Sequence, residues 1–178
     1  MKRCSAAHPI QEKEQNKMAF EKAEKFLSDR GFGDRIQTFS VSSATVELAA
    51  KALGTEPARI AKSLTFADGE GAIMVVCAGD VKVNSGKFKR AFDVKAKMLC
   101  FDQVHNLIGY DVGGVCPFDV NPETRIFLDE SLKRFQYVYP ACGSDNSAVK
   151  LTPQELEQLS GSIGWVDVCV PLVENAQK

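Results

Sequence analysis

The sequence lacks any hydrophobic run long enough to cross a membrane and any cluster of residues spaced to bind a metal. Its longest strongly apolar run, residues 72–78, is far shorter than the ~20 residues that a membrane-spanning helix requires. The six cysteines lie far apart, without a Cys-x-x-Cys pair or a nearby histidine to complete a zinc-ligand spacing. We therefore expect no membrane partner, no structural metal and no cofactor.

Histidine and the motifs of nucleophilic hydrolases are also scarce. His8 and His105 are the only histidines, and the sequence contains no GxSxG elbow, GxGxxG or Walker spacing. A Ser-His-Asp triad, dinucleotide binding and P-loop chemistry are therefore disfavoured. Cys116 with His105 is the one plausible thiol pair, although a cysteine in a glycine-rich loop is more often a packing residue. A thiol-dependent hydrolase using Cys116 stays an alternative, which a fully active Cys116→Ala variant would exclude.

What is present fits one globular domain. The chain has 178 residues, of which 44% are hydrophobic and 25% charged, close to the averages of folded proteins. Residues 1–17 are polar and lack the apolar core of a signal peptide, so we expect a loose extension there and a single domain over 18–175. A cytoplasmic location with reduced thiols is expected.

Charge is balanced overall but not locally. The net charge of -1 gives no general attraction to nucleic acid, and no DNA partner is expected. Residues 82–97, however, hold six cations against one acid, Asp93. The cations are Lys82, Lys87, Lys89, Arg90, Lys95 and Lys97. The segment is either a solvated face or a patch that binds a polyanion.

Periodicity and capping residues predict a mixed fold. Helices are predicted over residues 17–30, from Ser42 or Ser43 to Leu53, at Pro57, over 85–92, from Asp102, and from Thr152. Strands are predicted over residues 35–41, 62–67, 72–78, near 96–101, near 124–128, near 135–141, and at 164–168. Because no regular βαβ rhythm or internal repeat occurs, we expect an α+β fold with a mainly antiparallel or barrel-like sheet and surrounding helices.

Three segments carry residues that could perform chemistry. Lys62 places a cation at the start of an apolar strand, where an ammonium could pair with a phosphate or stabilise a developing oxyanion. Residues 109–117 hold three glycines and a proline, which let main-chain groups approach a ligand closely and stay aimed at it. Residues 141–147 are polar and could line the same site. Each has a plainer interpretation, namely an exposed strand end, a tight structural turn and a hairpin turn.

Taken together, these segments resemble the YbaK family of aminoacyl-tRNA deacylases, which is related to the editing domain of bacterial prolyl-tRNA synthetases. Residues 52–54 (Ala-Leu-Gly) followed by 60–64 match the family's helix and lysine-bearing strand, and Gly79-Asp80 matches its turn. Residues 109–110 with 113–117 match its glycine-proline loop. The resemblance covers most of residues 18–170.

The resemblance implies roles for particular residues. Lys62 would be the catalytic lysine, which holds the phosphate of the terminal adenosine or polarises the ester. The expected substrate-binding residues are Ser63, Gly109, Tyr110, Gly113, Gly114, Val115, Cys116, Pro117, Gly143 and Ser144. This chain departs from the family at residues 142–146 and at Ser63, where threonine or asparagine is common, which leaves the preferred amino acid open.

The expected function is therefore that of a trans-editing hydrolase. It would cleave the ester of a tRNA, by family analogy the tRNA for proline, that carries a small amino acid such as cysteine, alanine or serine. The partners would be the acceptor end of the aminoacyl-tRNA and prolyl-tRNA synthetase. A non-catalytic module that binds an amino acid, a nucleotide or aminoacyl-tRNA is the alternative.

Overall fold

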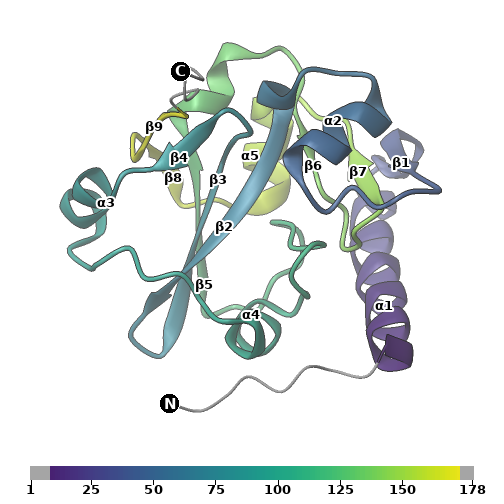
Figure 1. The fold of residues 1–178 in the computed structure, drawn as a ribbon, viewed down its shortest axis with the longest axis horizontal. Coiled ribbons are helices and arrows are strands. Elements are labelled where there is room, and N and C mark those ends of the chain that lie inside the picture. The colour runs from purple at the N-terminus through teal and green to yellow at the C-terminus, as the bar shows by residue number, and fades with distance from the viewer. Residues whose placement is uncertain (1–8, 173–178) are drawn as a thin grey trace, which may run out of the picture.

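The computed structural model describes residues 9–172 as helices packed around a twisted sheet (Figure 1). The α-helices are α1 (Pro9–Ser28), α2 (Val46–Leu53), α3 (Ser85–Phe92), α4 (Phe101–Ile108) and α5 (Pro153–Ser160). Short 3-10 turns span Gly33–Arg35, Pro57–Arg59 and Glu130–Arg134. In the described part of the chain, no helix has the length and apolarity needed to span a bilayer.

Within residues 9–172, nine strands form one central sheet and two small ones. The strands are β1 (Ile36–Thr38), β2 (Ile60–Asp68), β3 (Gly71–Ala78), β4 (Val81–Val83), β5 (Thr124–Asp129), β6 (Tyr139–Pro140), β7 (Ser147–Val149), β8 (Gly164–Val166) and β9 (Cys169–Pro171). The central sheet has the order β6-β2-β3-β5-β8, with β2 and β3 antiparallel and its other pairs parallel. The pairs β1-β7 and β4-β9 are antiparallel. The predicted α+β class is confirmed.

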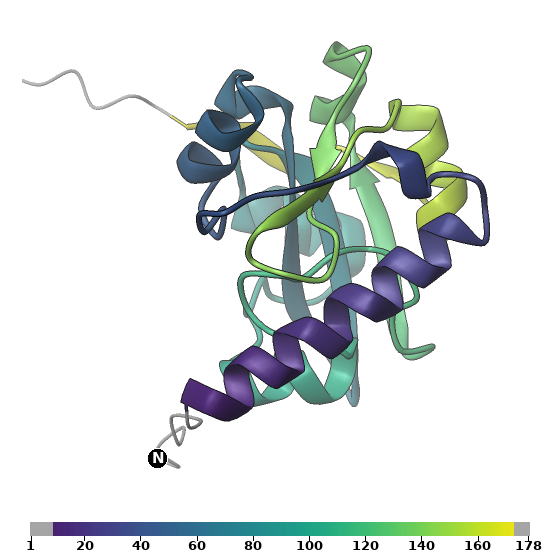
Figure 2. The ribbon, with the colours of Figure 1, turned by 90° about the vertical axis from the view of Figure 1, so that its right-hand side faces the viewer.

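The core lies on both faces of β3. Every residue of this strand from Ala72 to Ala78 is buried, as expected for a central strand that is covered on both sides. Helix α1 crosses one side of the molecule (Figure 2) and buries Ala19, Ala23 and Leu27, which lie on one face at helical spacing. On the opposite side of the sheet Phe66 of β2 packs against Phe88 of α3, with ring centroids 4.6 Å apart and the rings tilted.

Local signals placed several element boundaries correctly. Helix α5 begins with the predicted capping box, in which Thr152 accepts from the Glu155 N–H and Glu155 accepts from the Thr152 N–H. Helix α3 occupies the predicted residues 85–92. Helix α2 ends at Gly54 in the left-handed conformation, as predicted, but Thr45 caps it rather than Ser42 or Ser43.

Other boundaries differ from the prediction. Helix α1 begins at Pro9 instead of Lys17, so part of the segment predicted as a loose extension is helical; residues 1–8 lie outside the described part of the chain. The strand predicted near residues 96–101 is reduced to one bridge between Phe66 and Met98. The strand predicted near 135–141 shortens to β6. The helix predicted at Pro57 is a 3-10 turn. The two shortened strand segments pair with β2 only near its ends, which leaves them few ladder bonds.

Candidate functional site

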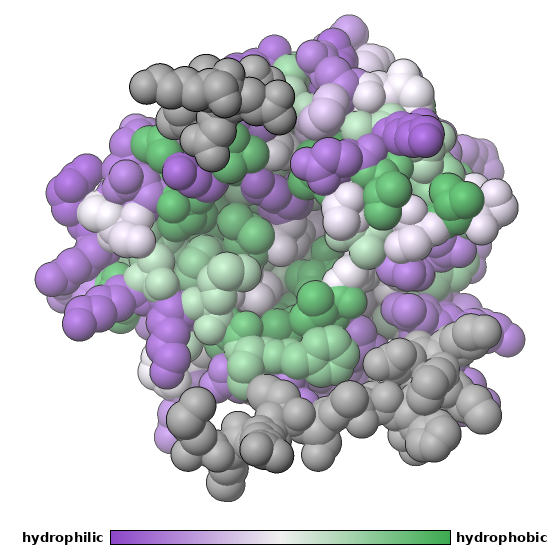
Figure 3. Space-filling view, in the orientation of Figure 1, coloured by the Kyte–Doolittle hydropathy of each residue, from purple (hydrophilic) through white to green (hydrophobic). Residues whose placement is uncertain are grey.

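A cavity of about 440 Å³ lies beside the middle of β2, within the size range of small-molecule sites. Strand β2 contributes residues 60–65 to its wall, and the segment leading into α2 contributes residues 43–46. The remaining lining residues are Ala49, Met98, Leu99, Val104, Val112, Gly113, Val115, Tyr139, Ala141, Ser147 and Ala148. On the face drawn in Figure 3, hydrophobic side chains gather over β2 and α4, with hydrophilic side chains around them.

Four of the predicted site residues meet in this cavity. Lys62 and Ser63 reach it from β2, and Gly113 and Val115 reach it from the glycine-rich loop. The lysine-bearing strand and the loop therefore converge on one cleft, which the proposed editing chemistry requires. Whether these residues bind a substrate stays a prediction.

Two further glycines shape the wall without lining it. A side chain at Gly114 would place its Cβ 2.7 Å from the Gly143 carbonyl oxygen, so the two backbones pack directly on each other. Gly143 has φ +80°, and a Cβ there would overlap the Ala19 carbonyl oxygen of α1. The glycines thus let the loop pack on the 141–147 turn and let that turn pack on α1.

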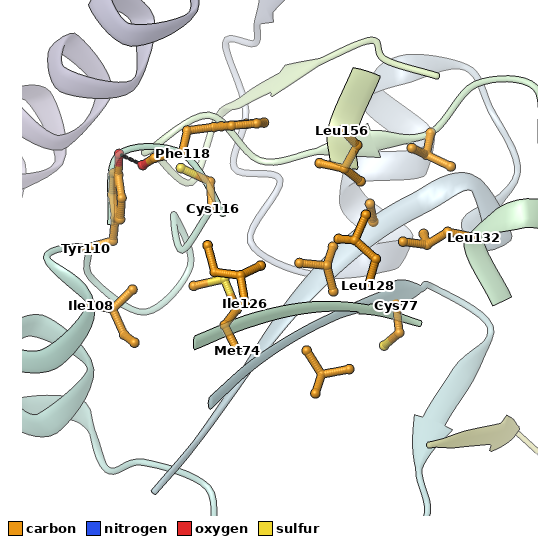
Figure 4. Close-up of a cluster of buried hydrophobic side chains, with 14 of the residues drawn as sticks. Met74, Cys77, Ile108, Tyr110, Cys116, Phe118, Ile126, Leu128, Leu132 and Leu156 are labelled. Carbon is orange, nitrogen blue, oxygen red and sulfur yellow. Dashed lines mark hydrogen bonds between the residues drawn. The ribbon is translucent and has the colours of Figure 1, made fainter. Parts of the chain in front are cut away.

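The first part of the glycine-rich loop faces a second cavity instead. This cavity, of about 280 Å³, is lined by Gly109 and Tyr110 together with residues of α1 and α4. Tyr110 is buried, and its hydroxyl donates to the Phe118 carbonyl oxygen at 2.6 Å (Figure 4). Burial in this apolar setting raises the Tyr110 pKa above its ordinary value.

Cys116 lies in the core (Figure 4). Pro117 is also buried, and neither residue lines the main cavity. Burial raises the Cys116 pKa to about 11, even though main-chain contacts with Phe118 and Gly143 oppose the shift. A thiol with that pKa is protonated at neutral pH, which makes it a poor nucleophile. His105 instead contacts Asp111, with Nδ1 2.8 Å from Oδ1, at the second cavity.

The Lys62 ammonium reaches the turn after β3. It donates to the Gly79 carbonyl oxygen at 3.2 Å and to the Val81 carbonyl oxygen. An ammonium has three N–H donors, so one remains for a ligand. In the same turn Asp80 forms a bidentate pair with Arg134, whose hydrogen bond lowers the Asp80 pKa; the Lys62 charge adds a smaller lowering.

The hydroxyl groups around the cavity differ in how they are used. Ser144 lies beneath the wall, where its hydroxyl donates to Asn146 Oδ1 at 2.9 Å and lies 2.7 Å from Ser147 Oγ. Ser43 donates to the Asp145 carbonyl oxygen at 3.0 Å. Ser63 Oγ, by contrast, is buried without a hydrogen-bond partner among the described residues.

Sequence reasoning missed part of the wall. It did not assign Thr45, Met98, Leu99, Tyr139 and Ala148 to the site, although all five line the cavity. Thr45 could have been noticed as a helix cap, but the others carry no local signal because long-range strand pairing brings them there. Between residues 9 and 172, no cluster of three or more His, Cys, Asp or Glu residues is placed to hold a metal ion.

Comparison with known proteins identifies relatives over most of the chain. A family model described as "Aminoacyl-tRNA editing domain" matches residues 41–159. The uncharacterized protein YwhH of Bacillus subtilis (strain 168) is 49% identical over 135 residues, which cover 75% of this chain and 86% of YwhH. EbsC of Enterococcus faecalis, described as a candidate Cys-tRNA(Pro)/Cys-tRNA(Cys) deacylase, is 24% identical over 68% of this chain and 76% of its own.

A solved structure and a larger enzyme extend this picture. A crystal structure described as a candidate trans-editing enzyme for prolyl tRNA synthetase superposes with a TM-score of 0.76 and is 28% identical, covering 92% of this chain and 98% of that one. A 78-residue segment of the proline–tRNA ligase of Thermotoga maritima is 32% identical and makes up 14% of that ligase. The fold and the sequence therefore agree on one family.

Proposed function

Because this chain belongs to the family of aminoacyl-tRNA editing domains, we propose that it is a trans-editing deacylase. It hydrolyses the ester of a tRNA mischarged with a small amino acid such as cysteine, alanine or serine, and the carrier is the tRNA for proline. The observation that carries this proposal is the cavity that Lys62 of β2 shares with Gly113 and Val115 of the glycine-rich loop. The names of EbsC and of the prolyl trans-editing structure support proline as the tRNA identity, and the second name supports prolyl-tRNA synthetase as a partner. An editing function implies that the protein acts in the cytoplasm.

The reaction requires the protein mainly to position the ester and the attacking water. An aminoacyl ester is already activated, so hydrolysis needs a placed water, a donor for the developing oxyanion and a wall that excludes larger side chains. The remaining N–H of Lys62 can serve either the ester oxygen or a phosphate of the terminal adenosine. No step requires a metal, a cofactor or a protein nucleophile.

The cavity offers a limited volume to the acyl group. Its glycine, alanine and serine residues leave that space open: Ser43, Ala44, Ala49, Ala61, Ser63, Gly113, Ala141, Ser147 and Ala148. The volume of about 440 Å³ leaves room for part of the terminal nucleoside beside the acyl group.

The basic segment is proposed to hold the acceptor end of the tRNA. Lys87 is engaged, since its Nζ lies 2.7 Å from Asp167 Oδ1 and 3.1 Å from the Cys169 carbonyl oxygen. Lys89, Arg90 and Lys95 are exposed and make no ion pair with any described residue. Lys97 directly precedes the cavity residue Met98. Such free cations can neutralise phosphates next to the cleft, and the rate at subsaturating tRNA should then fall steeply with added salt.

The direct test is a deacylation panel. Purified protein would be mixed with alanyl-, cysteinyl- and seryl-tRNA for proline, with correctly charged prolyl-tRNA as the reference. We expect at least one mischarged tRNA to be hydrolysed well above its spontaneous rate, and Lys62→Met to lose that activity. Saturable binding of all four without turnover would instead favour the binding module.

A further inference from the structure

The two edges of β2 are paired very differently. Toward β3, the strand is paired without interruption from Ala61↔Ala78 to Asp68↔Gly71. On the other edge it is paired only at its ends. Ile60 and Ala61 pair with β6, and near the far end the Leu99 N–H donates to the Thr65 carbonyl oxygen at 3.0 Å.

Ser63 lies in the gap between these two partners. In a strand, alternate residues direct their N–H and C=O to the same edge. The carbonyl of Thr65 and the N–H of Ala67 both bond to residues 97–99, so the N–H and C=O of Ser63 also point away from β3. Neither group has a partner on that side among residues 9–172. Ser63 lines the main cavity and is partly exposed as a whole, although its Oγ atom is buried. The accessible surface of Ser63 therefore consists of its main chain and Cβ.

We infer that this open edge at Ser63 binds the aminoacyl group of the substrate as a one-residue addition to the sheet. The Ser63 N–H donates to the ester carbonyl oxygen, and the α-ammonium of the acyl group donates to the Ser63 C=O. These are the two bonds that directly opposed residues exchange in an antiparallel ladder. The inference rests on the proposed deacylase function and names the chemical unit that the site reads, a single α-amino acyl group.

The width of the gap sets this specificity. Strand β6 closes the edge at Ala61, and residues 97–99 bond to the Thr65 carbonyl. Among the described residues, Ser63 is therefore the outward-facing residue between them whose N–H and C=O are both unpaired. A peptide would need a longer open edge, because strand addition uses several successive main-chain bonds. The site therefore admits an α-amino acid ester and excludes an extended peptide.

The same contact serves the chemistry. As the oxygen of water bonds to the carbonyl carbon, negative charge grows on the oxygen that the Ser63 N–H already contacts. The bond to the ribose oxygen then breaks, and the proton lost by the water ends on that ribose oxygen. The products are a free amino acid and an uncharged tRNA, with no change of oxidation state.

The side chain of the substrate would lie beside Ser63. Directly opposed residues in a ladder place their side chains on the same face, which here also carries Ala61 and Thr65. Because Ser63 Oγ has no hydrogen bond to lose, it can turn toward a hydroxyl or thiol on the bound side chain. A contact with Ser63 Oγ should therefore stabilise a bound seryl or cysteinyl group more than a bound alanyl group.

A binding experiment tests the main-chain contact without turnover. The wild-type protein would be titrated with 3′-alanylamino-3′-deoxyadenosine, in which an amide replaces the ester, while backbone amide resonances are followed by NMR. We expect the Ser63 amide to shift more than the Thr65 amide. Saturation by the ligand with an unmoved Ser63 amide would overturn the inference.

Kinetics on altered substrates and variants complete the test. A lactyl ester of the same tRNA lacks the ammonium, and its enzymatic rate, normalised to its spontaneous hydrolysis, should fall about 10- to 100-fold relative to alanyl. Ser63→Pro removes the outward N–H without removing a bond to β3 and should lose roughly 100-fold or more. Ser63→Ala keeps the N–H and should lose far less, with the larger part of its loss on seryl-tRNA.

These outcomes separate the inference from the proposed function. If the wild type deacylates alanyl and lactyl esters equally well, and Ser63→Pro, shown to be folded by circular dichroism, matches Ser63→Ala, then the inference is wrong and the deacylase stands. If the wild type hydrolyses nothing, the deacylase proposal fails, and the NMR titration still decides whether the aminoacyl unit binds at Ser63.

Discussion

The middle of β2 and the 141–147 turn both bring polar residues to the cavity wall, but they use them in opposite ways. In the turn, Ser144 and Ser147 are hydrogen-bonded to each other and to groups of the same segment. In β2, Ser63 has neither a main-chain partner on its outer edge nor a partner for its hydroxyl among the described residues. Buried polar groups that satisfy one another support the wall, whereas groups left unpaired beside a cavity are available to a ligand.

The strongest way to test the turn's structural role is Gly143→Ala. The new Cβ would overlap the α1 backbone at Ala19 while Gly143 is held at φ +80°. We expect a loss of about 3 kcal/mol or more in the free energy of unfolding, measured by urea denaturation. Gly161→Ala, at φ +61° with no atom within 4 Å, is the matched control and should cost only about 1 kcal/mol. Equal losses in the two variants would show that the close packing of Gly143 on α1 does not contribute to the free energy of unfolding.

Lys62→Met probes the other side of the comparison. It removes the ammonium of a cavity-lining residue and leaves the Gly79 and Val81 carbonyls without their donor. The deacylation rate should fall about 100-fold, and the free energy of unfolding should fall by about 1–2 kcal/mol. Lys51→Met, an exposed lysine at the end of α2, should change neither by a measurable amount. If Lys62→Met loses stability but keeps the wild-type deacylation rate, then Lys62 only stabilises the turn after β3.

Most of the fold could be predicted from local signals, because each such signal depends only on a few residues that are neighbours in the sequence. The capping box at Thr152, the left-handed Gly54 and the β2-β3 hairpin each depend on neighbours in the sequence. The shortened β6 and the bridge at Met98 depend on which strand lies beside β2, and no local pattern encodes that.

The site was predictable only in outline for the same reason. The motif order placed Lys62 and Gly113 in one cavity, as the structure does. Composition could not separate the two halves of the glycine-rich loop, because glycine and cysteine suit a tight core turn as well as a ligand cradle. The structure puts Val115 on the cavity wall and Cys116 in the core, one residue away.

Cys116→Ala sharpens that division within the loop. Since burial raises the Cys116 pKa to about 11, the thiol is protonated near neutral pH and is a poor nucleophile, so the variant should keep the wild-type rate per folded molecule. The small void should cost about 1–2 kcal/mol of unfolding free energy. Iodoacetamide labelling followed by mass spectrometry should modify the exposed Cys100 long before Cys116. Loss of activity with the fold intact would revive the thiol-dependent alternative.

The smallest effect is expected at the turn that Lys62 contacts. The hydrogen bond from Arg134 lowers the Asp80 pKa below its ordinary value, so the pair stabilises the fold above the unfolded pKa of about 4 and loses that contribution as pH falls through the lowered folded value. Both side chains are well exposed, so Asp80→Asn should cost at most ~1 kcal/mol of unfolding free energy at pH 7.

Urea denaturation of wild type and variant between pH 7 and pH 2 measures this effect. The gap in unfolding free energy between the two proteins should narrow below pH ~4. It should also shrink in 1 M salt, because an exposed pair is screened. A gap that stays constant down to pH 2 would mean that the turn is held by the Lys62 bonds to Gly79 and Val81 and that the substitution disturbs them instead.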